Sequence, residues 1–260
     1  TTAQVGALTT DQISAALTTD QVVALTTAQV ATLNTDQIQA LTTNQVKAIE
    51  TRDIAVLTTR QIGALTTDQI VALTTDQIVA LTTGQIGALT TDQIQSLTTN
   101  QVRNIETRDV AALTTRQIEA LTTSQVSAAL TTDQIVALTT GQVGALTTDQ
   151  IQVLTTNQVR ALETRDVASL KTAQIAALTT NQVKAALTTD QVAALTTAQV
   201  AALTTAQAAA LTTAQVVQGM STAQVAALET ADLVALGSSQ LAAFGTAQIA
   251  ALTTAQIGVI

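Results

Sequence analysis

The 260-residue chain is 47% hydrophobic, yet its only aromatic side chain is Phe244, and it contains no proline, cysteine, histidine, tryptophan or tyrosine. Its formal net charge is −8 with 11% charged residues, which excludes the basic stripe and aromatic platforms that nucleic-acid-binding proteins use. The missing cysteine and histidine exclude disulfides, most zinc sites and triad catalysis.

One eight-residue unit, the octad, accounts for the whole chain. Residues 66–81 contain TTDQIVAL twice in succession, and cutting the sequence at each leucine-like eighth position gives 32 units with nothing left over. Position two is Thr in every unit except at Ser238, and position four is Gln in 28 units and Asp in four. Four units carry one extra residue: 9–17, 122–130, 179–187 and 212–220. This fixed period indicates a repeat architecture rather than separate globular domains.

Each octad reads as one short helix. Thr is a good N-cap, and Thr at position one followed by Gln three residues later matches a capping box, with Leu before it and Ile after it as a hydrophobic staple. Position two varies less than position one, so the cap lies at one or the other. Gln, Ala and Leu then favour the helix, and positions five and eight fall on one face.

Two other folds compete with short helices. One continuous helix would rotate its apolar stripe by roughly 80° per octad, which leaves no apolar face for a coiled coil. A β-solenoid fits the Thr, Val and Ile content, but the apolar positions five, seven and eight do not alternate. We therefore predict an all-α solenoid of one-to-two-turn helices, one per octad, with a β-solenoid as the alternative.

A helix of about six residues is too short to be stable alone, so neighbouring octads must hold each one. We expect positions five, seven and eight to be buried and positions three and six to face outward. The Gln of position four should lie partly inside, hydrogen-bonded to the caps of neighbouring units, because a buried amide without a partner costs about 1–3 kcal/mol.

Residues 1–41 are regular octads, and a longer repeat of seven octads begins at residue 42. TTNQVKAIETRDIAVLTTRQ starts at 42, TTNQVRNIETRDVAALTTRQ at 98 and TTNQVRALETRDVASLKTAQ at 155. The spacings are 56 and 57 residues, with the extra residue supplied by the unit 122–130. This pattern indicates internal duplication.

Charged residues cluster in the seven-octad repeat. Asp replaces Gln at position four only where Glu occupies position one, so we expect the two to share one cap geometry. Two interpretations remain: a recurring ligand or cation site, or the favoured ladder of surface ion pairs, each worth at most about 1 kcal/mol. The charges of the three copies are Lys47, Glu50, Arg52, Asp53 and Arg60; Arg103, Glu106, Arg108, Asp109 and Arg116; and Arg160, Glu163, Arg165, Asp166 and Lys171.

The C-terminal segment 191–260 is nearly uncharged, because its only charged residues are Glu229 and Asp232. Ala occupies position three in most of its octads, which turns a polar face apolar; either another subunit covers this face or the sequence has drifted. No apolar run of about 18 residues occurs, so no membrane span is predicted. The chain begins and ends in phase, so we interpret 1–260 as one solenoid domain, a slice of a longer array.

Catalytic chemistry is missing from the sequence. No phosphate-cradling glycine loop occurs among the ten glycines, and the carboxylates mostly come one per octad. We therefore predict no enzyme, no catalytic, cofactor-binding or metal-binding residues, no cofactor and no small-molecule substrate.

The run TTAQVAALTTAQ at 196–207, with its variants throughout the chain, resembles octapeptide arrays of very large proteobacterial surface or secreted proteins, described as adhesin, RTX-like or haem-utilisation proteins. The resemblance covers the whole chain and implies an exported structural or adhesive role. Haem binding gains no support from the residues, because His, Tyr and Cys are missing and Met220 is the only methionine.

The pattern and the resemblance together predict a structural protein of the cell surface or extracellular space. We expect it to form a fibre, stalk or adhesin segment whose main partner is itself, through head-to-tail and also lateral contacts. The alternatives are an ice-binding or other surface-binding Thr array and a generic protein-interaction scaffold.

Overall fold

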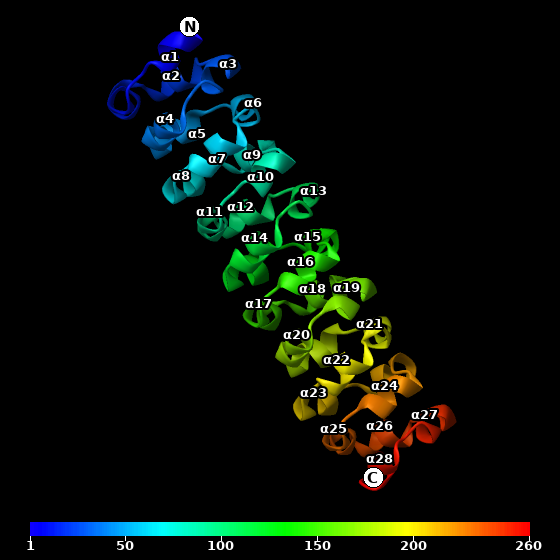
Figure 1. The fold of residues 1–260 in the computed structure, drawn as a ribbon. Helices are drawn as coiled ribbons and strands as arrows, with labels where there is room; N and C mark the ends of the chain where they lie inside the picture. The colour runs from blue at the N-terminus through cyan, green and yellow to red at the C-terminus, as the bar shows by residue number, and fades with distance from the viewer. The chain divides into compact units, whose positions relative to one another are not determined.

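The computed structural model describes all 260 residues, and every regular element is a short helix (Figure 1). The chain divides into two compact units, Thr1–Leu130 and Thr131–Ile260, and each is an all-α solenoid. The predicted fold class is confirmed, and the β-solenoid alternative is wrong because no residue forms a strand. None of the helices has the length and apolar character needed to cross a membrane.

Each octad contributes one helix, in chain order. The unit Thr1–Leu130 contains α1 (Thr2–Gly6), η1 (Gln12–Ala16), α2 (Thr19–Val23), α3 (Thr27–Val30), α4 (Thr35–Ala40), α5 (Thr43–Ala48), α6 (Thr51–Ile54), α7 (Thr59–Ala64), α8 (Thr67–Ala72), α9 (Thr75–Ala80), α10 (Thr83–Gly87), α11 (Thr91–Ser96), α12 (Thr99–Arg103), α13 (Thr107–Val110), α14 (Thr115–Ala120) and η2 (Gln125–Ala129). The unit Thr131–Ile260 contains α15 (Thr132–Ala137), α16 (Thr140–Ala145), α17 (Thr148–Val153), α18 (Thr156–Ala161), α19 (Thr164–Ser169), α20 (Thr172–Ala177), η3 (Gln182–Ala186), α21 (Thr189–Ala194), α22 (Thr197–Ala201), α23 (Thr205–Ala210), η4 (Gln215–Gly219), α24 (Thr222–Ala227), α25 (Thr230–Ala235), α26 (Ser238–Ala242), α27 (Thr246–Ala250) and α28 (Thr254–Ile257).

The capping box forms at position one. In α8, Thr66 has extended backbone angles, its hydroxyl accepts a hydrogen bond from the N–H of Gln69 at 3.2 Å, and the Gln69 side-chain oxygen accepts one from the N–H of Thr66 at 2.8 Å. This reciprocal bonding satisfies two of the donors that the start of a helix leaves free. The helix ends at Ala72, and the backbone of Leu73, with φ −56° and ψ 135°, leads to the next cap.

The four nine-residue units absorb their extra residue inside the helix. Each contains a π-helix, η1 to η4, in place of an α-helix. In η2, for example, the N–H of Leu130 donates to the carbonyl of Gln125 five residues earlier. The wider π-turn takes up one residue, so the following Thr cap stays in phase with the rest of the solenoid.

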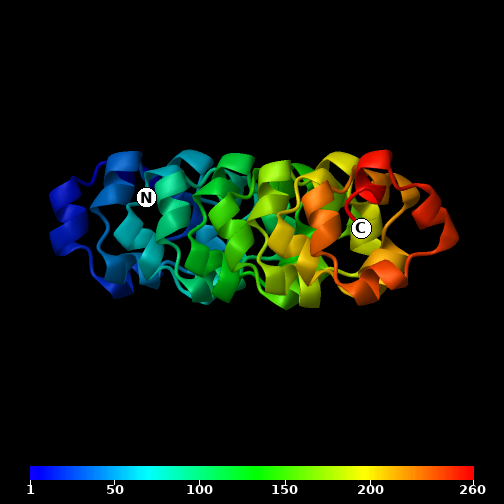
Figure 2. The ribbon, with the colours of Figure 1, turned by 90° about the horizontal axis from the view of Figure 1, so that it is seen from below.

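Successive turns of the solenoid are offset by a non-integral number of octads. Helices three octads apart lie against each other, as α5 does with α8 and α8 with α11. The amide of Gln69 in α8, however, donates to the carbonyls of Ile38 and Leu41, four octads earlier. One turn therefore takes between three and four octads, and seven octads complete two turns. Within the first unit, α6 and α13 accordingly lie at the same edge (Figure 1), and the short helices and their extended connections are also visible from below (Figure 2).

The core consists of positions five and eight. Ile70 and Leu73 are 0% and 4% exposed, whereas Val71 at position six is 47% exposed, as predicted for an outward position. Position seven is half-buried in most octads, so the prediction that it is buried is too strong. The reason is helical geometry, because position seven lies about 200° around the helix from position five.

Candidate functional site

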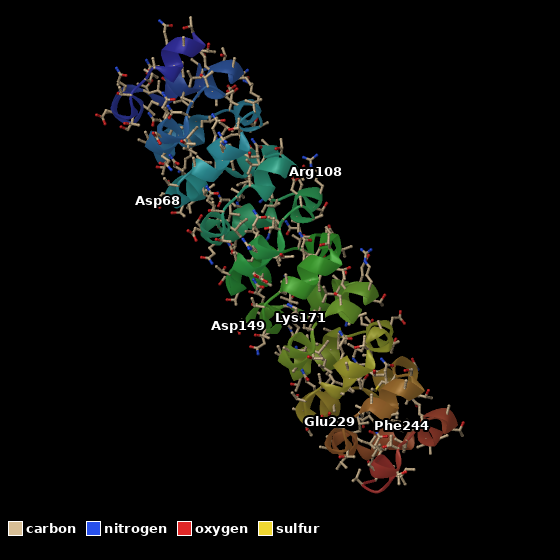
Figure 3. The ribbon with its side chains drawn as sticks, viewed as in Figure 1. Asp68, Arg108, Asp149, Lys171, Glu229 and Phe244 are labelled. Atoms are coloured by element: carbon tan, nitrogen blue, oxygen red, sulfur yellow. The ribbon has the colours of Figure 1, made fainter.

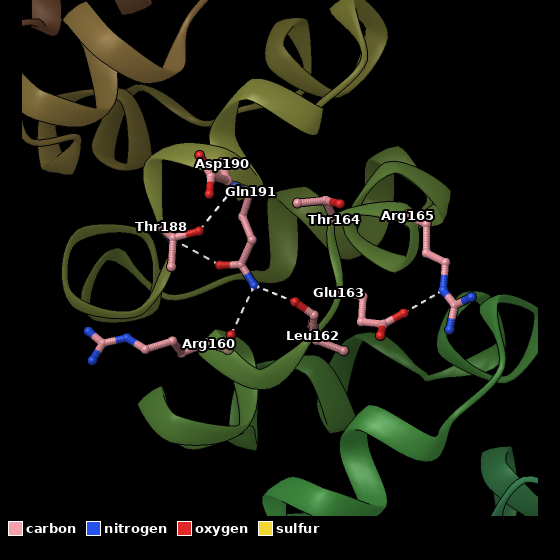
Figure 4. A pocket seen from close by; sticks show the side chains of 8 residues that line it. All are labelled: Arg160, Leu162, Glu163, Thr164, Arg165, Thr188, Asp190 and Gln191. Carbon is pink, nitrogen blue, oxygen red and sulfur yellow. Dashed lines mark hydrogen bonds and ion pairs between the residues drawn. The ribbon is translucent and has the colours of Figure 1, made fainter.

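A buried position-four Gln caps two helices at once. Gln191 is 2% exposed, and its side-chain oxygen accepts a hydrogen bond from the N–H of Thr188 at 2.9 Å (Figure 4). Its side-chain nitrogen donates to the carbonyls of Leu162 at 2.7 Å and Val159 at 2.9 Å, which belong to the end of a helix four octads earlier. The expected bonding of Gln to neighbouring caps is confirmed, and its burial is more complete than expected.

The Asp octads replace this double cap with a different contact. Asp53 is 1% exposed, and its Oδ1 accepts a hydrogen bond at 2.8 Å from the hydroxyl of Thr27, the position-two residue three octads earlier. Equivalent bonds join Asp109 to Thr83 and Asp166 to Thr140, at 2.6 and 3.1 Å.

The Glu at position one of these octads makes no side-chain cap hydrogen bond, so the expected shared cap geometry of Glu and Asp is wrong. The Asp side chain is one methylene shorter than Gln and carries no N–H donor. It therefore cannot span the two helix ends that a Gln joins.

Arg and Glu form the surface ion pairs that the sequence indicated. Arg52 lies 2.6 Å from Glu50, with side chains 64% and 38% exposed, and Arg108 lies 2.8 Å from Glu106. Arg108 is labelled at the surface of its unit in Figure 3. At such exposure each pair is worth at most about 1 kcal/mol. The same Arg side chains lie 3.8, 3.5 and 3.9 Å from Asp53, Asp109 and Asp166, so the ion pairs extend to the Asp residues, whose burial is not apparent from the sequence.

Open pockets lie beside two of the Glu-Arg pairs. One, of about 400 Å³, is lined by Arg160, Glu163, Arg165 and Asp190 among others (Figure 4). The other has the same composition, with Lys47, Glu50, Arg52 and Asp76. Each pocket has two positive and two negative side chains, so neither favours a ligand of one charge. No group of three or more acidic side chains is arranged to hold a metal ion.

Position two is the near-invariant Thr whose hydroxyl the capping box does not use. The capping hydroxyl belongs to position one, as at Thr66, and position-two residues such as Thr67 are exposed. Four of them, Thr27, Thr83, Thr140 and Thr205, donate to the buried Asp residues. The structure offers no hydrogen-bonding reason for Thr at position two in the other octads.

Burial raises the pKa of Asp232, opposed by the hydrogen bond from Thr205, and raises the pKa of Asp166 in the same way. Because the native pKa of Asp232 lies above its unfolded pKa, the native state is favoured while the carboxyl group is protonated. This contribution to the free energy of unfolding is lost as the pH rises through the native pKa. We therefore expect the free-energy advantage of Asp232→Asn over the parent protein to grow as the pH rises from acid toward neutral. Urea unfolding across this range measures it, and a pH-independent difference would contradict the expectation. Thr205→Val should move the transition to higher pH.

The comparison with protein families matches most of this chain. The ALTTAQ repeat model matches residues 15–49, 46–83, 102–140, 128–156, 136–164, 159–197 and 225–259. The chain belongs to the ALTTAQ repeat family. No curated protein matches it.

The ALTTAQ motif spans the junction between two helices. In residues 24–29, Ala24 and Leu25 end one octad, and Thr26, Thr27, Ala28 and Gln29 begin the next. The motif thus contains a core leucine, the N-cap and the double-capping Gln. These are the residues that build the repeat, and the family match supports a repeat protein with a structural or scaffold role.

Proposed function

We propose that this ALTTAQ repeat chain is a structural protein that builds an extracellular fibre, stalk or adhesin by stacking solenoid turns end to end, without catalysis. The observation that carries the proposal is the stacking of each turn on the one before it through Gln amides and core side chains, a contact that one copy can make with the next.

The first turn exposes amides and leucines. Gln4, Gln12 and Gln21 are exposed, and their side-chain nitrogens make none of the cross-turn bonds that buried Gln residues make. Leu8, Leu17 and Leu25 at position eight are half-buried, whereas the position-eight leucines from Leu33 onward are buried. Position eight is therefore the residue that packs on the preceding turn.

The last turn exposes the opposite partners. Ile249 and Ile257 at position five are 47% and 57% exposed, although position-five residues elsewhere are buried. Position five is therefore the residue that packs beneath the following turn. In earlier octads, the carbonyls of positions five and eight accept hydrogen bonds from the side-chain nitrogen of a Gln four octads later. The corresponding carbonyls in this octad are those of Ile249 and Leu252.

A second copy placed on the last turn would supply what both ends lack. Its four N-terminal Gln amides would meet carbonyl acceptors, and its leucines would cover Leu241, Ile249 and Ile257. This contact is heterologous and does not close, so repeated addition gives a filament. The apolar segment 191–260, with Val234 54% exposed, supplies a face for lateral contacts between filaments.

The extracellular location rests on the resemblance to arrays of large surface and secreted proteins and on the lack of cysteine, which makes a chain insensitive to an oxidising compartment. Protease treatment of intact producing cells tests it. Loss of the protein while a cytoplasmic marker survives supports a surface location, and protection until lysis contradicts it.

The assembly is tested with the 260-residue chain by sedimentation velocity and negative-stain electron microscopy. We expect filaments whose length increases with concentration. The triple variant Leu241→Lys, Ile249→Lys, Ile257→Lys should remain as single copies, because it places charges on the last turn while leaving the interior unchanged. The matched control Val71→Lys, Val79→Lys, Val136→Lys alters side chains 40–47% exposed on the lateral surface and should still form filaments.

Filaments formed equally by the last-turn variant would contradict end-to-end stacking. A parent chain that remains monomeric at high concentration, with helical circular dichroism intact, would contradict the fibre function itself.

A second candidate is binding to ice or another regular surface. The exposed position-two Thr hydroxyls that have no intramolecular partner favour it, because an outward array of hydroxyls is what such a surface requires. Thermal hysteresis of the purified chain is the test, and freezing behaviour identical to that of an inert protein would exclude ice binding.

A further inference from the structure

Three backbone groups, one N–H and two carbonyls, are hydrogen-bonded to the side-chain amide of a buried Gln. The oxygen of Gln77 accepts from the N–H of its own N-cap residue, Thr74, at 2.9 Å. Its nitrogen donates to the carbonyls of Val46 and Ile49, four octads earlier, at 2.8 and 2.7 Å. One amide thus serves a donor at the start of one helix and two acceptors at the end of another.

The Asp octads have the same surrounding groups but no amide. In the octad of Asp53, the N–H of Glu50 is not part of a capping box, and Val22 and Leu25 occupy the places of the two carbonyls. The Asp53 Oδ1 is occupied by the hydroxyl of Thr27, but its Oδ2 is buried and has no hydrogen-bond partner. The Oδ2 atoms of Asp166 and Asp232, 0% and 1% exposed, are buried without a partner as well.

Each of these places therefore has acceptors and a donor that lack the Gln amide. The buried carboxylate oxygen and the position-eight carbonyl of an earlier helix are acceptors, and the N–H of the Glu is a donor; the position-five carbonyl keeps a backbone donor, as Val22 does with the N–H of Leu25 at 3.1 Å. Leaving such groups unsatisfied is costly, and nearly all buried polar groups in native proteins have a protein or water partner.

We propose that the octads of Asp53, Asp166 and Asp232 each bind one internal water molecule in the place that a Gln amide nitrogen takes in other octads. The water donates one hydrogen to the Asp Oδ2 and the other to the position-eight carbonyl four octads earlier. It accepts a hydrogen bond from the N–H of the position-one Glu. These three bonds match the number that buried waters make in proteins.

The size of the side chain favours water over direct contact. Asp is one methylene shorter than Gln, so its carboxyl group lies further from the carbonyls that Gln reaches. A cation would be held by one carboxylate and backbone carbonyls alone, because no cluster of acidic side chains is present at these places. Water satisfies donors and acceptors together, whereas a cation cannot accept a hydrogen bond from the Glu N–H.

The chain suits a direct test, because it contains only five Glu residues and three of them, Glu50, Glu163 and Glu229, begin the proposed water-binding octads. The full chain is labelled with ¹⁵N-glutamate, and magnetisation transfer from water to the amide protons is recorded by NMR at neutral pH. These three amides should show cross-peaks with the sign of a long-lived bound water. Glu119, at an exposed position six, serves as the control and should show none.

Replacing Asp with the Gln of the common octad distinguishes a bound water from other sources of the NMR cross-peak. Asp166→Gln should abolish the cross-peak of Glu163 and leave that of Glu50 unchanged, and Asp53→Gln should do the reverse. Both variants restore the residue found in 28 octads, so folding is preserved. Thr140→Val should retain the cross-peak of Glu163, which excludes relay through the exchanging hydroxyl of Thr140.

Three results would overturn the proposal. The first is the lack of a long-lived water signal at all three Glu amides. The second is a carboxyl ¹³C shift that shows Asp166 protonated at neutral pH, because a neutral acid would donate to a carbonyl itself. The third is a change of these amide shifts on titration with Na⁺, K⁺ or Ca²⁺, which identifies a cation as the occupant. The proposal does not depend on filament assembly.

Discussion

Replacing Ile70 or Ile78 with Asp should unfold the surrounding turns, because these position-five side chains are 0% and 2% exposed. The substitution removes a core side chain and places a carboxylate where no donor can pair with it. Such changes cost about 4–5 kcal/mol or more, a large part of the roughly 5–15 kcal/mol that stabilises a typical domain. Urea unfolding followed by far-ultraviolet circular dichroism measures the loss.

The matched controls are Val71→Asp and Val79→Asp, one residue further along the same two helices. These side chains are 47% and 40% exposed, so each substitution should change the free energy of unfolding by only about 0.5 kcal/mol. Equal effects at positions five and six would show that the assignment of the buried helix face is wrong.

Gln69→Ala should be nearly as damaging, although it removes no apolar contact. It leaves the N–H of Thr66 and the carbonyls of Ile38 and Leu41 without their side-chain partner. The Ile38 carbonyl keeps the N–H of Leu41 as a partner, so two groups are left unpaired, and at about 1–3 kcal/mol for each group the expected loss is about 2–6 kcal/mol.

The first turn supplies a control of nearly the same sequence. Gln21 lies in TTDQVVAL, its amide is exposed, and its side-chain oxygen bonds only to Thr18. Gln21→Ala should therefore cost about 1 kcal/mol, the usual value of a lost cap. Similar losses at Gln21 and Gln69 in chemical unfolding would show that the cross-turn bonds contribute nothing to stability.

Local features of the octad could be predicted from the sequence because they depend on neighbours within eight residues. The helix, the capping box and the burial of positions five and eight all follow from the spacing of Thr, Gln, Ile and Leu. The choice between positions one and two for the cap was open, because the greater constancy of position two has a cause that capping does not supply.

Features that depend on contacts between turns could not be predicted. The sequence does not state how many octads complete a turn, so the carbonyl partners of Gln69 at Ile38 and Leu41 were not identifiable. For the same reason the burial of Asp53 and its hydrogen bond to Thr27 could not be predicted, although it does lie 3.8 Å from Arg52. The four Asp residues at the otherwise amide-bearing position four were the signal that could have revealed this burial.

The offset between turns has a mechanical consequence. Within each unit a helix lies against the helix three octads before it and is hydrogen-bonded to the helix four octads before it. A force applied to one helix is therefore transmitted to two helices of the adjoining turn. A pull along the axis is then divided between neighbours at every level, and no straight seam runs the length of the unit along which bonds could tear one after another. Rupture of a unit would require several amides and core side chains to separate together, which raises the force that a solenoid without disulfides can bear.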